Sequence, residues 1–160
     1  MALEPTDAQI NRHPLKEAAT GGRSTLDAGF PACQTALMKR ASVEITQQFG
    51  FDAAHFLEQS PLRSNRRMHG HSFYAEVTLR GEPDPEKGWV RDFTEVNAAL
   101  SEIRGELDHQ LLNDLEGLGT PTLENLARYI FREAKNRLPE VCRVRLSRPS
   151  SGQSCIYEES

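Results

Sequence analysis

The chain has 160 residues, of which 38% are hydrophobic, enough for one domain with a single modest core. Its formal net charge is -4, with 23 acidic against 19 basic residues, which argues against a nucleic-acid binder that works by neutralising phosphates. No apolar run approaches the roughly 18 residues of a membrane-spanning helix, and no signal peptide is recognisable. The sequence therefore predicts a soluble, cytoplasmic protein without a membrane partner.

Cysteine usage points away from a disulfide scaffold. Cys33, Cys142 and Cys155 are an odd number, and no two of them form a C-x-x-C pair. A disulfide framework needs paired cysteines, and a cysteine zinc site needs closely spaced ones. We therefore expect reduced thiols.

The first 40 residues differ in pattern from the rest of the chain. Prolines and glycines are scattered among polar residues there, without a sustained period of 3.6 or 2. We expect a disordered extension over residues 1–40 and a folded domain over residues 41–160. Met38 stands immediately before the first clear strand pattern, so translation from that residue is an open alternative.

Two strands are predicted next by the alternation of apolar and polar residues. The first begins near Ser42, and the second runs to Arg80, before glycine and prolines break the chain. Their apolar faces are Val43, Ile45 and Phe49 in the first strand, and Phe73, Ala75, Val77 and Leu79 in the second.

Two helices follow, each preceded by a residue whose side chain can cap its first turn. Asp92 precedes the first helix, which ends near Asp108, and Thr122 precedes the second, which Pro139 stops. Apolar residues repeat at three and four positions along both: Phe93, Val96, Leu100, Ile103 and Leu107, then Leu123, Leu126, Ala127, Ile130, Ala134 and Leu138.

Two more strands close the chain, one containing Cys142, Val144 and Leu146, the other running from Ser154 to Glu158. The element order is strand, strand, helix, helix, strand, strand. This order predicts an α+β domain, in which an antiparallel four-stranded sheet has both helices on one face. The exposed edges of such a sheet are natural places for subunits to pair, so we expect a homo-oligomer.

A metal site is predicted around three histidines. In His69-Gly70-His71, side chains at i and i+2 point to the same face of a strand, and His55 lies just after the strand expected to pair with it. Three neutral imidazoles leave a tetrahedral zinc one open position, as in catalytic sites. An isolated H-x-H is more often two unrelated histidines. Here three of the five histidines lie between positions 55 and 71, which favours a Zn²⁺ site.

Two basic clusters are candidates to hold a polyphosphate. One contains Arg63, Arg66 and Arg67, and the other contains Arg143, Arg145 and Arg148. Arg143 and Arg145 share a strand face by their i, i+2 spacing. Solvated arginines on an exposed face are an equally good interpretation of either cluster.

Several motifs occur together in one order and spacing: Phe51-Asp52-Ala53-Ala54-His55, His69-Gly70-His71-Ser72-Phe73, Gly88-Trp89-Val90-Arg91-Asp92-Phe93, Leu107-Asp108-His109-Gln110-Leu111-Leu112-Asn113, Pro121-Thr122-Leu123-Glu124-Asn125 and Cys155-Ile156-Tyr157. With them, residues 51–158 resemble the family of 6-pyruvoyl- and 6-carboxytetrahydropterin synthases. The latter belong to queuosine and deazapurine biosynthesis.

The resemblance implies the tunnelling fold, in which subunits join their sheets into a barrel, as trimers or hexamers. It implies a lyase that binds zinc through His55, His69 and His71 and acts on 7,8-dihydroneopterin triphosphate, with the metal as Lewis acid. It also implies that Asp108 orients His109, which moves protons. Taken alone, Asp108-His109 is better explained as a helix C-terminus followed by a favourable cation.

Two positions depart from the family pattern. Asn65 stands where these synthases usually carry a catalytic cysteine, and Pro149 stands where a glutamate anchors the amino-pyrimidine edge of the pterin. Cys33 is an alternative source of the thiol, and Glu124 and Glu158 are alternative anchoring acids. Two functional classes stay open: a zinc enzyme of the synthase type, and a diverged relative that binds another small molecule or a partner protein.

Overall fold

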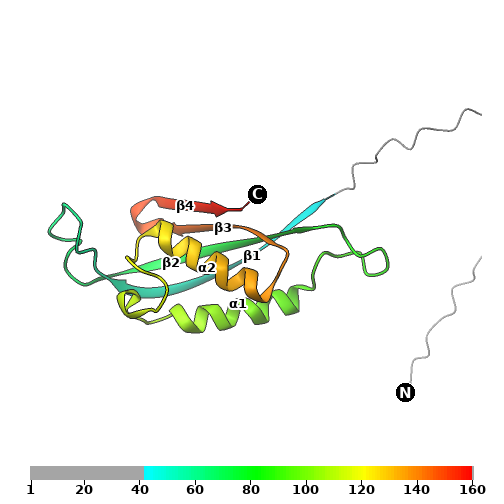
Figure 1. The fold of residues 1–160 in the computed structure, drawn as a ribbon, viewed down its shortest axis with the longest axis horizontal. Helices are drawn as coiled ribbons and strands as arrows, with labels where there is room; N and C mark the ends of the chain where they lie inside the picture. The colour runs from blue at the N-terminus through cyan, green and yellow to red at the C-terminus, as the bar shows by residue number, and fades with distance from the viewer. Residues whose placement is uncertain (1–41, 160) are drawn as a thin grey trace, which may run out of the picture. The chain divides into compact units, whose positions relative to one another are not determined.

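A computed structural model describes residues 42–159 as one antiparallel sheet with two helices on one of its faces (Figure 1). The strands lie in chain order, β1-β2-β3-β4. The α+β prediction is therefore confirmed. The expected extension over residues 1–40, with Cys33 and Met38, lies outside the described residues. The strands are β1 (Val43–His55), β2 (His69–Gly81), β3 (Val141–Arg148) and β4 (Gln153–Glu158).

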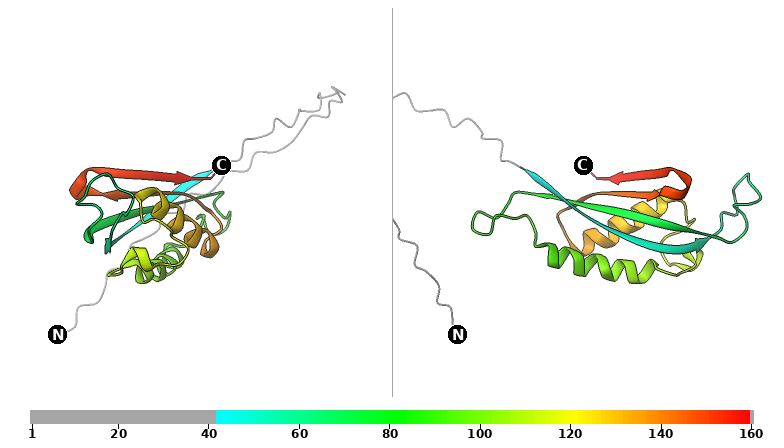
Figure 2. Two further views of the ribbon diagram at one scale, coloured as in Figure 1. Left: turned by 60° about the vertical axis from the view of Figure 1, so that its left-hand side comes forward. Right: turned by 180° about the vertical axis from the view of Figure 1, so that it is seen from behind.

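Both helices begin at the caps that the sequence predicts. The Asp92 side chain accepts the Thr94 N–H at the start of α1 (Phe93–Leu107), and Thr122 accepts the Asn125 N–H at the start of α2 (Leu123–Arg137). Figure 2 shows the two helices on the same side of the sheet. Short 3₁₀ turns, η1 (Leu112–Asp114) and η2 (Pro149–Ser151), complete the described elements. None of the helices in residues 42–159 is long and apolar enough to cross a membrane.

The long β1–β2 pair sets the position of the histidines. Its register places His55 opposite His69 and Ala53 opposite His71. The expectation that His55 follows the first strand is wrong by one residue, because its pairing with His69 extends β1 through His55. Directly opposed residues share a face of the sheet, so all three imidazoles lie on the face that the helices cover.

The core fills the space between that face and the helices. The predicted apolar face of β2 is confirmed, because Phe73, Ala75, Val77 and Leu79 are all buried. Thr78 departs from the alternation, since it is also buried and its hydroxyl lies 3.0 Å from that of Thr46. Beyond Phe73 the same row continues into His71 and His69, so the histidines begin where the apolar core ends.

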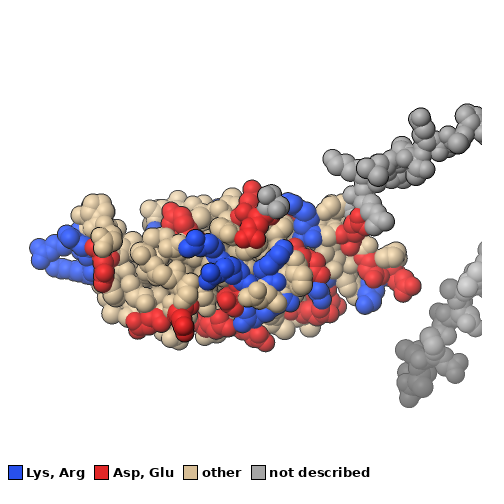
Figure 3. All heavy atoms as spheres, viewed as in Figure 1, with Lys and Arg blue, Asp and Glu red and all other residues tan. Residues whose placement is uncertain are grey.

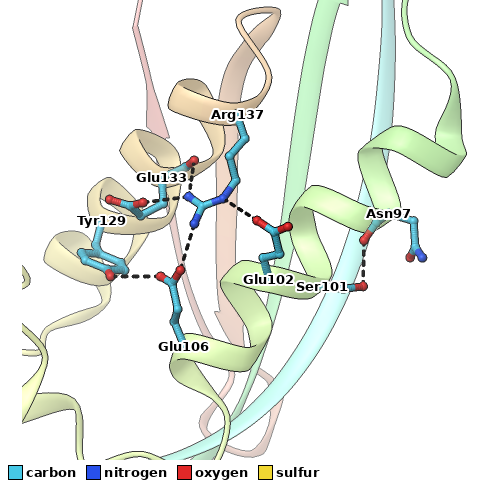
Figure 4. A network of polar contacts seen from close by, with 7 residues as sticks. All are labelled: Asn97, Ser101, Glu102, Glu106, Tyr129, Glu133 and Arg137. Atoms are coloured by element: carbon cyan, nitrogen blue, oxygen red, sulfur yellow. Dashed lines mark hydrogen bonds and ion pairs between the residues drawn. The ribbon is translucent and has the colours of Figure 1, made fainter.

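A polar cluster joins the two helices at their surface (Figure 4). The guanidinium group of Arg137 on α2 lies 2.9 Å from the Glu106 carboxylate and 3.3 Å from the Glu102 carboxylate, both on α1. It also lies 2.8 Å from the Glu133 carboxylate on its own helix. Glu106 also accepts a hydrogen bond of 3.4 Å from the Tyr129 hydroxyl. We call these five residues the Arg137 cluster. It links the two helices through side-chain contacts.

Candidate metal centre

Three imidazole rings meet at one end of the sheet. Their ring centroids are 4.6 Å apart for His55 and His69, 5.2 Å for His55 and His71, and 5.0 Å for His69 and His71. One nitrogen from each ring lies within 4.8 Å of the others, a spacing at which one ion can contact all three. The structure thus brings together the histidines that the sequence singled out.

Backbone carbonyls determine which nitrogen each ring offers. The Nδ1 atom of His55 lies 2.8 Å from the Pro121 carbonyl oxygen, and that of His69 lies 2.8 Å from the Arg67 carbonyl oxygen. A carbonyl oxygen only accepts hydrogen bonds, so each Nδ1 carries the proton and each Nε2 keeps a free lone pair. Metal-binding histidines commonly use this arrangement to fix tautomer and ring orientation.

Burial favours the neutral form that a metal requires in two of the rings, His55 and His71. His55 is only 2% exposed, and burial lowers the pKa of its imidazole, although the Pro121 carbonyl opposes this. Burial, with the nearby charge of Arg148, lowers the pKa of His71 to about 4. In residues 42–159 the buried Nε2 atoms of His55 and His71 have no hydrogen-bond partner. Unpartnered buried lone pairs are costly, and a zinc ion would satisfy them, so the residues fit the metal.

Asn113 holds the chain immediately after His55. Its side-chain oxygen accepts the Phe56 N–H at 2.9 Å, and its side-chain nitrogen donates to the Phe56 carbonyl at 3.0 Å. This two-point contact fixes the end of β1, where His55 enters the site. Sequence reasoning assigned no role to Asn113, because its contact joins residues 57 positions apart, nor to the Pro121 and Arg67 carbonyls, because backbone groups leave no trace in residue type.

Asp108 and His109 lie beside the metal centre, on the turn that ends α1. Asp108 accepts the Asp52 N–H at 2.9 Å and a hydrogen bond from Arg104 at 3.2 Å, while the His109 N–H donates to the Asp52 carbonyl at 2.7 Å. These contacts tie the turn to β1. They also lower the pKa of Asp108, chiefly through the Asp52 N–H, so its carboxylate stays ionised at neutral pH.

His109 points its side chain into solvent at a pocket shared with the metal centre. Its φ of 60° is left-handed, a conformation that non-glycine residues adopt mainly at strained or functional turns. Its ring Nε2 lies 4.0 Å from the Asp108 carboxylate, and its side chain is 81% exposed. His109, His71, Asp52, Ser72 and Gln110 line a pocket of about 580 Å³, called here the His109 pocket.

Residues 44–160 match the model of a protein family described as 6-pyruvoyl tetrahydropterin synthase. The chain belongs to this family. Its members act on pterins, which makes the protein a relative of pterin-metabolising enzymes. The resemblance inferred from the sequence motifs is therefore confirmed.

Individual relatives carry different activities within the tetrahydropterin synthase family. A 6-carboxy-5,6,7,8-tetrahydropterin synthase of Synechocystis is 39% identical over 92 residues, which cover 54% of this chain and 70% of the relative. A dihydroneopterin monophosphate aldolase of Pyrococcus furiosus is 35% identical over 95 residues, covering 59% and 77%. The structure of Caenorhabditis elegans 6-pyruvoyl tetrahydropterin synthase superposes with a TM-score of 0.67 at 28% identity, covering 75% of this chain and 97% of that one.

The family's usual cysteine has no evident substitute among residues 42–159. Asn65, at its position, is half-buried in the β1–β2 loop, where its backbone hydrogen bonds to Leu57 and Leu62. Cys142 donates to the Thr78 carbonyl, and burial raises the pKa of the Cys155 thiol, which disfavours a thiolate. Neither cysteine lines the His109 pocket. Cys33 lies outside the described residues.

A second pocket, of about 370 Å³, adjoins His55 and is called here the Arg148 pocket. It is lined by His55, Leu57, Thr122, Leu123, Glu124, Arg148, Gln153 and Ser154. Glu124, proposed from sequence as an alternative anchoring acid, therefore lies next to the metal centre. Glu158 does not, since it lines a different pocket with Arg80 and Cys142.

The second basic cluster does not assemble as one site. Arg143 forms an ion pair with Glu44 at 2.8 Å and Arg145 one with Glu76 at 2.8 Å. Arg148 differs from the other two arginines in its orientation, because the alternation of β3 puts it on the face of Val144 and Leu146. The spacing that paired Arg143 with Arg145 also separates Arg148 from them, so the sequence already held this signal. The interpretation of these three arginines as one polyphosphate site is therefore wrong.

Proposed function

We propose that the protein is a zinc-dependent lyase of the 6-carboxytetrahydropterin synthase type, acting on 7,8-dihydroneopterin triphosphate. The observation that carries this proposal is the group of three histidines, two of which have buried, unpartnered Nε2 atoms, next to a pocket that His109 also lines. Bound zinc would supply Lewis-acid polarisation of the substrate's side-chain hydroxyls. The remaining chemistry falls to residues of this chain.

His109 is the proposed proton carrier. Its exposed ring faces the pocket, and a histidine can both take and give a proton near neutral pH. Asp108 is the positioning residue: its ionised carboxylate is fixed to β1 through the Asp52 N–H and lies 4.0 Å from the His109 ring.

The β1–β2 loop is the proposed contact for the substrate's phosphates. Arg63, Arg66 and Arg67 lie on this loop, which joins His55 to His69, and Figure 3 shows Lys and Arg side chains gathered at that end of the molecule. In residues 42–159 no carboxylate lies within ion-pair distance of these three arginines, unlike Arg143 and Arg145. Unpaired guanidinium groups beside a metal centre suit a polyphosphate.

A homo-oligomer is part of the proposal. Strands β1 and β4 are the edges of the described sheet. Residues 108–111 already pair with Asp52 and Ala54 at one end of β1, while the rest of its outer edge and that of β4 have no strand partner within the described residues. Joining these edges between subunits would build the trimer or hexamer expected for the tunnelling fold. The Caenorhabditis elegans structure, similar over most of both chains, supports that comparison.

A second candidate is an aldolase that cleaves a carbon–carbon bond in the side chain of a phosphorylated dihydroneopterin. The Pyrococcus furiosus relative with this type of name is 35% identical over 77% of its length. No cysteine of residues 42–159 lines the His109 pocket, which favours this candidate, since the resemblance to the synthases implies a catalytic cysteine. A non-catalytic binding protein is the remaining alternative.

One incubation separates these functions. Zinc-loaded protein is given 7,8-dihydroneopterin triphosphate or 7,8-dihydroneopterin monophosphate, and the pterin products are identified by mass spectrometry. Loss of the triphosphate with formation of a 6-carboxytetrahydropterin, in which one of the three side-chain carbons remains as the carboxyl group and the other two leave, supports the synthase. A 6-hydroxymethyl pterin from the monophosphate supports the aldolase, and the absence of turnover of either compound contradicts both enzymes.

A further inference from the structure

Arg148 is a half-buried cation with no carboxylate of residues 42–159 within ion-pair distance. It ends β3, and its Nη2 donates a hydrogen bond to the neutral side chain of Gln153. Its Nε atom is buried and has no partner in residues 42–159, and no carboxylate of those residues forms an ion pair with it. Burial accordingly lowers the pKa of Arg148, although Glu124 opposes the shift and an arginine stays charged at neutral pH.

Glu124 lines the same pocket as Arg148 but does not form an ion pair with it. It lies in the first turn of α2, where its own backbone N–H and the Thr122 hydroxyl lower the pKa of its carboxyl. A carboxylate can accept further hydrogen bonds with its remaining lone pairs. The Arg148 pocket thus has an ionised acceptor at one position and unused donors at another, with Leu57 and Leu123 also among its lining.

This arrangement matches the edge of a dihydropterin ring. Going around that ring, the 2-amino group and N3–H are donors, and the next two polar atoms, O4 and N5, are acceptors in the 7,8-dihydro form. The O4 and N5 pair has the geometry of O6 and N7 of guanine, which arginine binds with two parallel N–H groups. His55 belongs to the candidate metal centre and also lines this pocket, so a pterin whose side chain reaches the metal from this pocket has its ring beside Arg148.

We propose that Arg148 is a specificity residue that donates to O4 and N5 of a 7,8-dihydropterin while Glu124 accepts from the ring's donor edge. This inference rests on the proposed function, because it takes a pterin as the ligand of the metal centre. In a 5,6,7,8-tetrahydropterin, N5 carries a hydrogen and becomes a donor that faces the guanidinium. Arg148 therefore selects the dihydro over the tetrahydro oxidation state.

The test measures dissociation constants of 7,8-dihydroneopterin and 5,6,7,8-tetrahydroneopterin with zinc-loaded protein under anaerobic conditions. We expect wild type to prefer the dihydro compound by roughly 10- to 100-fold, the discrimination typical of a bidentate arginine contact. Arg148→Met is expected to bring the ratio near one. Arg148→Lys is expected to do the same, since it keeps the charge but loses the planar fork. Zinc content and melting temperature check that each variant folds.

An unchanged ratio in Arg148→Met overturns the inference, and so does a ratio retained in Arg148→Lys, which would show that charge alone matters. Binding of inorganic tripolyphosphate is the second arm, with Arg63→Met as the matched variant. If Arg148→Met weakens tripolyphosphate binding and leaves the pterin ratio intact, Arg148 is a phosphate contact and the ring assignment is wrong. If wild type binds neither pterin, the proposed function itself fails, together with this inference.

Discussion

Two polar regions of this molecule are built in opposite ways. In the Arg137 cluster, charged groups of α1 and α2 satisfy one another through ion pairs and hydrogen bonds. At the metal centre, buried Nε2 atoms of His55 and His71 and the nearby Nε of Arg148 have no partner in residues 42–159. Because burying an unpartnered polar group costs free energy, the first arrangement indicates stability and the second indicates a ligand.

The remaining unpartnered atoms of residues 42–159 sharpen this contrast. Arg91 Nε and Glu140 Oε2 are both buried without a partner, but they belong to two side chains that already form an ion pair of 2.7 Å. Each residue there has satisfied its charge through another atom. His55 and His71 lack that alternative, since their free lone pairs are what a metal would bind.

The largest effect is expected from removing a ligand of the metal centre. His55→Ala should lower zinc affinity by more than the roughly 10- to 100-fold that loss of a ligand's hydrogen-bond partner costs. Metal analysis after dialysis measures it, with His109→Ala as the matched control, because His109 lies outside the group of three ligands. Equal zinc content in wild type and His55→Ala would show that His55 is not a zinc ligand, and the proposed contrast between a ligand site and a stabilising cluster would then be wrong.

The next effect concerns proton transfer without metal loss. His109→Ala should lower turnover of the accepted pterin substrate by roughly 10²- to 10⁴-fold, the usual contribution of a general acid or base. Asp108→Asn should lower it less, because the amide oxygen keeps the contact with the Asp52 N–H, while the charge and the hydrogen bond from Arg104 are lost. Full activity in His109→Ala would show that another residue moves the proton.

A smaller effect is expected from a substitution in the Arg137 cluster. Arg137→Met should reduce the free energy of unfolding by about 1 to 2 kcal/mol, since it removes several partly buried charged hydrogen bonds and leaves Glu102, Glu106 and Glu133 close together. Zinc content should not change. The control is Arg128→Met, an exposed residue of the same helix, expected to alter stability by less than about 0.5 kcal/mol. A loss of zinc in Arg137→Met would show that the regions are coupled.

No measurable effect is expected from shortening the chain to begin at Met38. The removed residues lack an apolar periodicity that would pack on the domain. Chemical denaturation and metal analysis should match those of the full chain. Aggregation or metal loss would show that the segment is structural, and would bring Cys33 forward as a source of the absent thiol.

Much of this molecule could be predicted from sequence because the signals are local. Asp92 and Thr122 are recognisable caps, and the alternation in β2 identifies its buried face. The grouping of the three histidines could also be predicted, because the pairing of two neighbouring strands is enough to bring them together.

The contacts that complete the site could not be predicted from local sequence patterns. Pro121 reaches His55 across 66 positions, and Asn113 reaches Phe56 across 57, so both depend on how the helices pack. Arg148 was grouped with Arg143 and Arg145 by proximity in the chain, although strand alternation separates it from them. Its lack of a counter-ion is visible only once the neighbouring side chains are placed.

The most direct test of the account is the position of the metal. A crystal of zinc-loaded protein, measured on both sides of the zinc absorption edge, gives an anomalous map that locates zinc independently of the surrounding atoms. The account predicts one strong peak per chain, in contact with the Nε2 atoms of His55, His69 and His71. A peak elsewhere, or none at these three histidines in protein that contains stoichiometric zinc, would contradict it.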